Sequence, residues 1–368
     1  MPPIPARPLL PLGEGPQVIV YHQTHYLPNS SQPVSILPLI TNNTGITHVI
    51  IAAIHLNDPP GNVTLNNDNP DHEKFQTLWA EVAWLQASGV KVLGMLGGAA
   101  KGSFERLDGH DIQRFDSYYT PLRDTIRAHN FDGLDLDVEE NMSLDGIIRL
   151  IDRLRTDFGS SFLITLAPVA TALLPLQPHL SGFSYSTLER QRGDQIAWYN
   201  TQFYCGWGDA STTFWYDAIL ASGWKPKKVV MGLITNPALG AGYVPWEKME
   251  GVLRTLRSRY PSFGGVMGWE YFCALPGGQV RPWEWVELMA GVLRTPMQVE
   301  QSPDASAVPV AQQRPPFGAP AMPAPQHPFP AESVMTLQEL GFNQQQAVAA
   351  LKMTGGDVEQ AAGLLFAD

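Results

Sequence analysis

The chain has 368 residues, more than the roughly 250–300 residues that one hydrophobic core usually holds, so we expect one large domain and a smaller one. Hydrophobic residues make up 44% and charged residues 16% of the chain, a composition typical of folded proteins and not of disordered ones. The net charge of −11, with no cluster of Lys and Arg, argues against a nucleic-acid partner, and no segment approaches the ~20 consecutive apolar residues of a membrane helix.

The N-terminus and the cysteines predict a cytoplasmic protein. Prolines interrupt residues 1–17 where a signal peptide needs an apolar helical run, so we do not expect conventional secretion. The chain has only two cysteines, Cys205 and Cys273, which fits a reducing compartment. We expect both to be small, buried, apolar residues.

Short apolar runs that are typical of buried strands alternate with longer runs of helical periodicity. The predicted strands are 17–22, 46–56, 91–98, 131–139, 162–170, 200–207, 228–235 and 263–272. The predicted helices are 71–89, 111–130, 143–159, 213–223, 246–260 and 280–294. Gly89 is placed to end the first helix, and Pro121 predicts a kink or a break in the second.

This alternation over residues 17–294 predicts an α/β fold, the parallel (β/α)8 or TIM barrel. The strands are apolar almost throughout, as expected for strands that are buried on both faces. An open, doubly wound sheet is the alternative. It is less favoured, because no Gly-x-Gly-x-x-Gly motif follows the first strand.

The composition changes after Arg294, and this divides the chain into three predicted segments. Residues 1–295 form the barrel. Residues 296–331 are rich in proline, which excludes regular secondary structure and predicts a disordered linker. Residues 332–368 predict a small bundle of three helices, because three capping-box spacings mark helix starts. These pairs are Thr336 with Glu339, Asn343 with Gln346, and Asp357 with Gln360.

Five acidic residues fall within FDGLDLDVEE, residues 131–140, although the run is otherwise that of a buried strand. Alternate residues of a strand face the same way, so Asp135, Asp137 and Glu139 share one face, and the end of the strand lies at the mouth of a barrel. Three neighbouring acids repel one another, so we expect at least one raised pKa. Glu139, the last of the row, is the predicted general acid. The alternative is that the carboxylates are structural and only accept hydrogen bonds.

The acids Asp132-x-x-Asp135-x-Asp137-x-Glu139 resemble the signature of family-18 glycoside hydrolases, the chitinases and their relatives. The resemblance covers roughly residues 15–295. Three further elements are similar to those of the family and of its plant-type (class III) chitinases. They are Leu96-Gly97-Gly98, where Met95 stands in place of the family's serine, Gln202-Phe203-Tyr204, and Gly265-Val266-Met267-Gly268-Trp269.

The resemblance implies a mechanism with no protein nucleophile, no cofactor and no metal. Glu139 would protonate the glycosidic oxygen, and the acetamido oxygen of the substrate's own N-acetylglucosamine (GlcNAc) would attack the anomeric carbon to form an oxazolinium ion. Asp137 would hold the acetamido N–H, Tyr204 would bind its oxygen, and Asp135 would tune Asp137. The implied substrate-binding residues are Trp269, which would stack on the sugar, Gln202, Gly97, Gly98 and Met267.

Other polar residues of these strands have structural interpretations. Asp132 has the opposite parity to the other acids, so we expect a structural role for it. His22, His25 and His55 follow the first two strands and could suggest a metal site. We interpret them instead as polar residues that line the barrel mouth, and we predict no metal.

Residues 340–365 resemble ubiquitin-associated domains, which are three-helix bundles. Leu340-Gly341-Phe342 matches the loop after their first helix, and Leu364-Leu365 matches the leucine pair of their third. In that family the two elements form an apolar patch that binds ubiquitin, which implies ubiquitin or ubiquitinated proteins as partners. The alternative is that these side chains complete the bundle's own core.

The resemblance implies a substrate that contains GlcNAc and leaves its nature open. The first hypothesis is a retaining endochitinase. The alternative is a cytosolic endo-β-N-acetylglucosaminidase that cuts the chitobiose core of N-glycans. A third hypothesis is a ubiquitin adaptor whose barrel binds sugar without cutting it. No large insertion follows the seventh strand, so we expect an open groove, which favours endo cutting.

Overall fold

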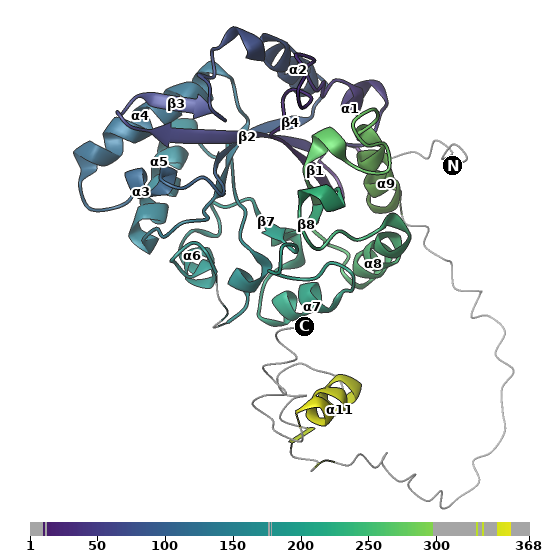
Figure 1. Ribbon diagram of the computed structural model, residues 1–368. Coiled ribbons are helices and arrows are strands. Elements are labelled where there is room, and N and C mark those ends of the chain that lie inside the picture. The colour runs from purple at the N-terminus through teal and green to yellow at the C-terminus, as the bar shows by residue number, and fades with distance from the viewer. Residues whose placement is uncertain are drawn as a thin grey trace, which may run out of the picture. The chain divides into compact units, whose positions relative to one another are not determined.

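Eight parallel strands close into a barrel in the N-terminal part of the chain (Figure 1). The computed structural model describes residues 10–296 except 12, 176 and 178, together with 329, 333–334 and 344–354. The strands are β1 (Gln17–His22), β2 (His48–Asn57), β4 (Lys91–Gly97), β5 (Gly133–Asp137), β6 (Leu163–Leu166), β7 (Trp198–Gln202), β8 (Val229–Ile234) and β9 (Gly265–Trp269). Because β1 pairs with both β2 and β9, the ring is closed and the predicted barrel is confirmed.

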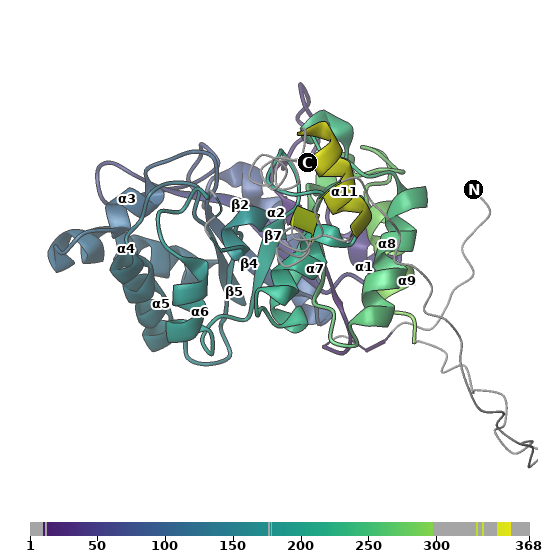
Figure 2. The ribbon, with the colours of Figure 1, turned by 90° about the horizontal axis from the view of Figure 1, so that it is seen from below.

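Helices surround the strands (Figure 1). They are α1 (Pro38–Thr41), α2 (Gln76–Ala87), α3 (Ser103–Leu107), α4 (Ile112–Ala128), α5 (Leu144–Phe158), α6 (Tyr185–Arg192), α7 (Phe214–Ala221), α8 (Trp246–Arg259) and α9 (Trp283–Leu293). Short 3₁₀ helices are η1 (Glu73–Phe75), η2 (Ala170–Leu173), η3 (Pro226–Lys228), η4 (Pro237–Leu239) and η5 (Tyr271–Cys273). In Figure 2, α3 to α6 lie together on one side of the strands and α7 to α9 on the other. Among the described helices, none is long and apolar enough to cross a membrane.

The sequence pattern does not reveal α6 or the additional strand β3. Only Tyr185 and Leu188 of α6 are buried, so this short helix has no apolar stripe that a periodicity could detect. β3 (Asn62–Leu65) pairs antiparallel with the far end of β2, and Asn57 lies opposite Asn62. The resulting β2–β3 hairpin is an addition to the ring of eight parallel strands.

Two apolar layers hold the barrel together. The larger one lies between strands and helices and contains Leu134, Leu136 and Val138. The smaller one fills the barrel interior, as is usual for this architecture. Its buried members are Ile19, Tyr21, Ile50, Ala52, Ala53, Leu93, Met95, Trp198, Tyr204, Val230, Ile234 and Met267. The alternation along β5 therefore directs its leucines outward and its acids into the barrel.

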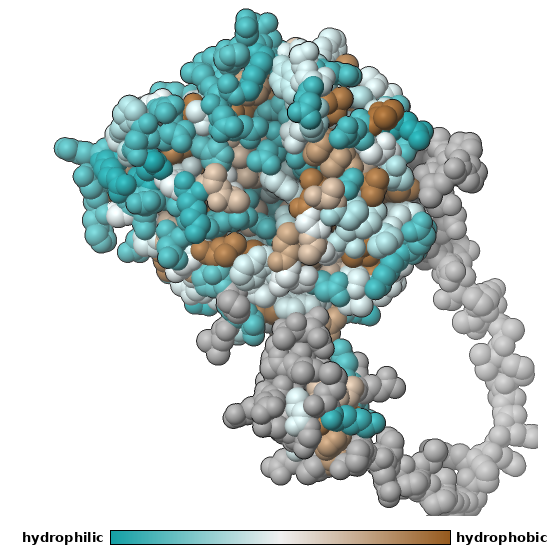
Figure 3. Space-filling model, in the orientation of Figure 1, coloured by the Kyte–Doolittle hydropathy of each residue, from teal (hydrophilic) through white to brown (hydrophobic). Residues whose placement is uncertain are grey.

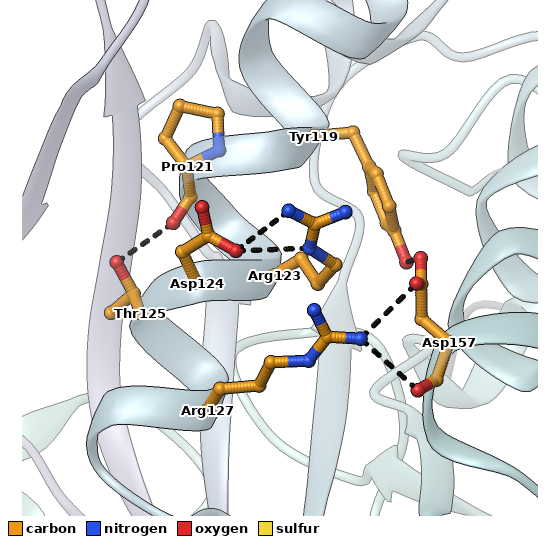
Figure 4. A network of polar contacts seen from close by, with 7 residues as sticks. All are labelled: Tyr119, Pro121, Arg123, Asp124, Thr125, Arg127 and Asp157. Carbon is orange, nitrogen blue, oxygen red and sulfur yellow. Dashed lines mark hydrogen bonds and ion pairs between the residues drawn. The ribbon is translucent and has the colours of Figure 1, made fainter.

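Helix α4 passes through Pro121 without a break, so a break, one of the two predicted outcomes, is wrong. The hydroxyl of Tyr119, before the proline, and the guanidinium of Arg127, after it, both donate to the Asp157 carboxylate of α5, at 2.7 and 3.2 Å (Figure 4). The Thr125 hydroxyl also donates to the Pro121 carbonyl at 2.9 Å. These contacts hold α4 against α5 on both sides of the proline and offset the hydrogen bond that proline cannot donate.

Arg294, directly after α9, joins the two ends of the barrel. Its side chain is buried, and its guanidinium donates to the carbonyl oxygens of Leu10, Pro11, Glu14 and Pro16 at 2.7 to 3.1 Å. These backbone carbonyl groups accept hydrogen bonds from most of the buried N–H groups of the guanidinium. Buried N–H groups without a partner would destabilise the fold. The segment before β1 is therefore fixed against the end of α9.

The second unit, Gln298–Asp368, is described mainly by one helix, α11 (Gln344–Met353). Its residues Ala347, Ala350 and Leu351 are buried, so one face of the helix is packed. The helix begins directly after Asn343, one of the predicted starts. The other two predicted starts and most of the predicted linker lie outside the described residues, and the division into three segments stays a prediction.

Candidate active site

The acids of β5 lie at the carboxyl end of the strand, on its inner face. Asp135 is fully buried, Asp137 is 6% exposed, and Glu139, just past the strand end, is partly exposed. Exposure therefore increases along the row toward the barrel mouth. Glu139 is the member that solvent reaches, which is the position that a general acid needs.

Asp135 is held by side chains from three other strands. Its carboxylate accepts hydrogen bonds from the Tyr21 hydroxyl at 2.6 Å, the Thr165 hydroxyl at 2.5 Å and the Asn200 amide at 3.0 Å. Burial raises the pKa of Asp135, whereas these three donors favour the ionised form. A carboxylate with three donors is the natural place for the negative charge of this site.

Gln202, at the end of β7, links the other two acids. Its Nε2 lies 3.2 Å from Oδ1 of Asp137, 3.3 Å from Oε1 of Glu139 and 2.9 Å from the carbonyl oxygen of Ala167. An amide nitrogen carries two hydrogens, so three acceptors must share them. The structure therefore places Gln202, which the resemblance assigns to substrate binding, between the two carboxyl groups.

The pKa values of Asp137 and Glu139 are raised, mainly by burial, and the predicted repulsion between acids contributes at Asp137. Burial raises the pKa of Asp137 well above its ordinary range, and the charges of Glu139 and Asp135 raise it further. Burial also raises the pKa of Glu139, while the hydrogen bond from Gln202 acts in the opposite direction. The two acids titrate as a pair, and we expect the pair to keep at least one proton at neutral pH.

Tyr204 and Trp269 lie on the same inner surface. Tyr204 is 7% exposed, and burial together with the charges of Asp137 and Glu139 raises the pKa of its hydroxyl well above the ordinary value. The hydroxyl is therefore neutral and can donate a hydrogen bond. Trp269 is partly exposed, and its ring lies 5.4 Å from the ring of Tyr21. Its exposed surface can take the apolar face of a ligand.

Three other predicted substrate-binding residues are deeply placed. Met267 is buried in the barrel interior beside Gly232. Gly97 has a φ of +93°, and a Cβ there would lie 2.6 Å from the carbonyl oxygen of Asp137. The amide of Gly98 donates to that same oxygen at 2.9 Å. Glycines at the end of β4 thus let the chain approach Asp137 closely. A contact with substrate stays a prediction for Met267, Gly97 and Gly98.

The other two acids of residues 131–140 are structural. At the opposite end of β5, Asp132 accepts hydrogen bonds from Lys91 at 2.8 Å and from the Gln86 side chain at 2.9 Å. Glu140 is buried and accepts from the backbone amides of Gly102 and Phe104, both at 2.8 Å. The structural role predicted for Asp132 is confirmed, and Glu140 fixes the start of α3.

The histidines and cysteines correct two expectations. His22 is fully buried, with its ring 4.9 Å from that of His25, so it does not line the mouth. Cys205 is exposed, whereas Cys273 is buried as expected. Within the described ranges, no group of three His, Cys, Asp or Glu side chains is arranged to hold a metal ion.

The sequence pattern did not single out Tyr21, Thr165 and Asn200 as part of the site. Each lies on a different strand with its side chain inward. Parity shows that such residues face the interior, but it does not show which of them lie at the same level of the barrel. The three donors to Asp135 follow only from the register between strands.

The family model named Glycosyl hydrolases family 18 matches residues 17–242, more than half of the chain. The chain belongs to glycosyl hydrolase family 18. The model named UBA/TS-N domain matches residues 329–365, so a UBA domain follows the family-18 barrel. The predicted ubiquitin-binding residues Leu340, Gly341, Phe342, Leu364 and Leu365 lie outside the described residues.

Two solved structures are similar to the barrel over nearly their whole length. A chitinase from Aspergillus fumigatus is 59% identical, with a TM-score of 0.69, and the match covers 75% of this chain and 98% of that chain. A fungal endo-β-N-acetylglucosaminidase is 49% identical, with a TM-score of 0.73, and the match covers 76% and 98%. The two names point to different substrates.

The curated relatives are longer proteins. Chitinase 2 from Rhizopus oligosporus is 32% identical over 209 residues, which are 52% of this chain and 36% of that protein. Chitinase 1 from Rhizopus niveus is 29% identical over 53% of this chain and 40% of its own length. The chain therefore spans less than half the length of these two relatives.

Proposed function

We propose that this family-18 enzyme is a retaining glycosidase that cuts β-1,4 bonds next to GlcNAc, with the substrate's acetamido group as the nucleophile. One observation carries the proposal. Asp135 and Asp137 on β5 and Glu139 just past its end stand in a row, and Glu139 is the most exposed of the three. Two carboxyl groups that flank a sugar from opposite sides are the usual arrangement for a protein nucleophile. A row that runs along one strand and past its end favours one general acid and two carboxyl groups that assist it.

Each residue has a role that its surroundings support. Glu139, with its raised pKa, protonates the glycosidic oxygen and later acts as base toward water. Asp137 accepts the acetamido N–H, and the neutral hydroxyl of Tyr204 donates to the acetamido oxygen. The charge on Asp135, behind them, stabilises the positive oxazolinium ion. Trp269 stacks on the sugar.

We propose chitin oligosaccharides as the first substrate class. The A. fumigatus structure, named a chitinase, is 59% identical to this chain and is matched over 98% of its own length. Chitin is a linear polymer of β-1,4-linked GlcNAc, so each of its bonds presents the acetamido group that the mechanism needs. Endo cutting of such chains is part of the proposal.

N-glycans are the second candidate, and two observations favour them. The 49% identical structure is named an endo-β-N-acetylglucosaminidase. The UBA domain matched at 329–365 fits a cytoplasmic location, where ubiquitinated glycoproteins are available. In this case the enzyme would cut the chitobiose core, and the C-terminal domain would bring it to its substrates.

One experiment separates the two substrates. The purified full chain is offered tetra-N-acetylchitotetraose and a high-mannose glycopeptide in one tube, and the products are read by mass spectrometry. Chitobiose with an intact glycopeptide is the expected result. A glycopeptide left with one GlcNAc would show the second activity instead, and two intact substrates would overturn the glycosidase proposal.

We also propose that the UBA domain binds ubiquitin through Leu340-Gly341-Phe342 and Leu364-Leu365. The family match supports the domain, and binding through this patch is the proposal. In an NMR titration with labelled ubiquitin, the full chain is expected to shift the signals of ubiquitin's hydrophobic face, and Phe342→Ala is expected to weaken binding at least tenfold. Unchanged ubiquitin signals would contradict the proposal.

Gln202→Leu is expected to move the alkaline limb of the pH profile of kcat/KM upward. Gln202 donates to the carboxylate of Glu139 and so lowers its pKa, which means that its loss extends the protonated, active form to higher pH. The loss of a hydrogen bond to a charged group predicts a shift of about one pH unit. Gln86→Leu, which removes the same kind of bond to Asp132 outside the site, is the matched control. An unshifted limb would contradict the role of Gln202.

A further inference from the structure

The charge proposed for Asp135 lies inside the barrel, where most neighbouring side chains are apolar. The molecular face in Figure 3 is hydrophilic over the β2–β3 hairpin, whereas the cluster that fills the barrel consists of apolar and aromatic residues. Asp135 is 0% exposed. A carboxylate in such surroundings stays ionised only while hydrogen-bond donors are directed at it. The groups that keep these donors in place therefore matter for the mechanism.

Among the three donors to Asp135, the Asn200 amide differs from the two hydroxyl groups. The hydroxyls of Tyr21 and Thr165 can rotate and either donate or accept, so they suit Asp135 with or without its proton. An amide nitrogen only donates, and an amide oxygen only accepts. Asn200 therefore favours a charged Asp135 in one orientation, with Nδ2 toward the carboxylate. In the opposite orientation two oxygen atoms would face each other, which would favour a protonated Asp135.

Trp198, two residues before Asn200 on β7, fixes this orientation. Its Nε1 donates to Oδ1 of Asn200 at 2.9 Å. Because an indole N–H donates and does not accept, the atom that faces it must be the amide oxygen. The amide nitrogen is then directed at Oδ1 of Asp135, at 3.0 Å. The two hydrogen bonds from Trp198 through Asn200 to Asp135 thus run in one direction.

The Trp198 ring is itself held in place. It is 4% exposed, and the ring of His48 lies against it edge-on, with 4.8 Å between the ring centres. Nδ1 of His48 lies 2.8 Å from Oγ1 of Thr47, which fixes the imidazole in turn. Thr165 of β6 is the register partner of both Asp135 on β5 and Trp198 on β7. The indole is therefore fixed at the level of the barrel from which it reaches the amide.

We propose that Trp198 is a positioning residue: its indole N–H holds the Asn200 amide with Nδ2 toward Asp135, so that Asp135 keeps its negative charge while the oxazolinium ion forms. This role rests on the proposed glycosidase function, because the positive ion is what the charge stabilises. Trp198 acts through the amide and does not touch the sugar. Its contribution is expected in kcat and not in KM.

The loss of an oriented donor predicts a change in the pH profile. The titratable groups that interact electrostatically with Asp135 are Tyr21 of β1, Asp137 of its own strand, Tyr204 after β7 and Tyr185 of α6. The pKa values of the three tyrosines are raised, so these groups stay neutral, and the acids of the row are the groups that titrate with Asp135. A donor to a carboxylate lowers its pKa, so losing the donor raises it. The acid limb of kcat/KM should therefore move to higher pH.

Trp198→Phe keeps a buried aromatic ring and removes the N–H. In the full chain, kcat on chito-oligosaccharides is expected to fall about tenfold, with KM within about threefold, and the acid limb should move up by about half a pH unit. Trp224→Phe is the matched control, because Trp224 is also buried and its indole N–H donates to the Leu173 carbonyl at 2.7 Å, in the layer outside the strands. It should lower the melting temperature similarly and leave kcat and the limb unchanged.

Two further variants test whether Trp198 acts through Asn200. In an Asn200→Ala background, Trp198→Phe should change kcat by less than about twofold, because the link is already broken. Effects that multiply, or a loss of kcat without a shift of the acid limb, would show that the indole only supports the fold. Asn200→Asp serves if Trp198→Phe does not fold. It keeps an oxygen for the indole and removes the donor, so the limb should rise by at least about one pH unit. An unshifted limb contradicts the proposal.

The outcomes for the wild type separate this role from the function on which it rests. A wild type that cuts neither an oligosaccharide nor a glycopeptide overturns the proposed function, and the role of Trp198 falls with it. A wild type that cuts only glycopeptides is measured on that substrate, with the same expected losses. If the wild type is active and Trp198→Phe has the same kcat and pH profile, the positioning role is wrong while the function stands.

Discussion

Glu139→Gln is expected to lower kcat on chito-oligosaccharides by about 10²–10⁴-fold, the usual contribution of a general acid. Glutamine keeps the size of the side chain and cannot supply the proton. Glu139 is the one acid of the β5 row that is partly exposed, so the substitution should leave the fold intact. Initial rates and a thermal melt of the same preparation measure the two effects.

The neighbouring Glu140→Gln provides the control, because the chemistry of the change is the same. Glu140 accepts two backbone amides at the start of α3, at 2.8 Å each. Its substitution is therefore expected to lower the melting temperature and to change kcat by less than tenfold. If Glu139→Gln kept full activity, the barrel would not work as an acid catalyst, and a sugar-binding adaptor would be the better hypothesis.

Asp137→Asn is expected to lower kcat by about 10²-fold and to raise the stability of the fold at neutral pH. The loss of activity follows because an amide oxygen accepts the acetamido N–H more weakly than a carboxyl group that can ionise. The gain in stability follows from burial, which raises the pKa of Asp137 well above its ordinary value. Each unit of pKa elevation corresponds to about 1.4 kcal/mol.

The size of this gain in stability depends on pH. When the pH rises above about 4, the unfolded chain releases the Asp137 proton first, so the folded wild type loses relative stability until its own raised pKa is reached. The Asp137→Asn variant has no carboxyl group at this position, so it does not lose stability in this way. The difference in melting temperature between Asp137→Asn and wild type should therefore be positive at pH 7 and vanish near pH 3.

Asp132→Asn is the matched control for stability, because Asp132 pairs with Lys91 and accepts the Val92 amide at 2.9 Å. Its carboxylate is favourable in the fold, so the asparagine variant should melt at a lower temperature at pH 7. A lower melting temperature for Asp137→Asn as well would show that Asp137 is stabilised as a carboxylate and would contradict the proton assignment.

The strand β5 shows why much of this site follows from the sequence. Its period of two separates Leu134 and Leu136 from Asp135 and Asp137, and the apolar neighbours fix the strand as buried. An acid that ends such a strand must lie at the barrel mouth. Local patterns of this kind predicted all eight strands of the ring.

Such local patterns could not predict the side-chain contacts between strands. The three donors to Asp135 come from β1, β6 and β7, whose relative levels depend on the shear of the closed barrel. The bridging position of Gln202 depends on the same register. α4 continues through Pro121 because Asp157 of α5 holds it from outside, and a helix pattern read alone cannot include that partner.

Closure of the ring has a consequence for the newly made chain on the ribosome. β1 can pair with β2 soon after both are synthesised, but its other edge has no partner until β9 is made. An open strand edge is a template for pairing with other chains. Arg294, made later still, is what fixes Leu10 and Pro16. Nascent chains that do not yet include β9 should therefore need protection by chaperones. Variants truncated before β9 should aggregate.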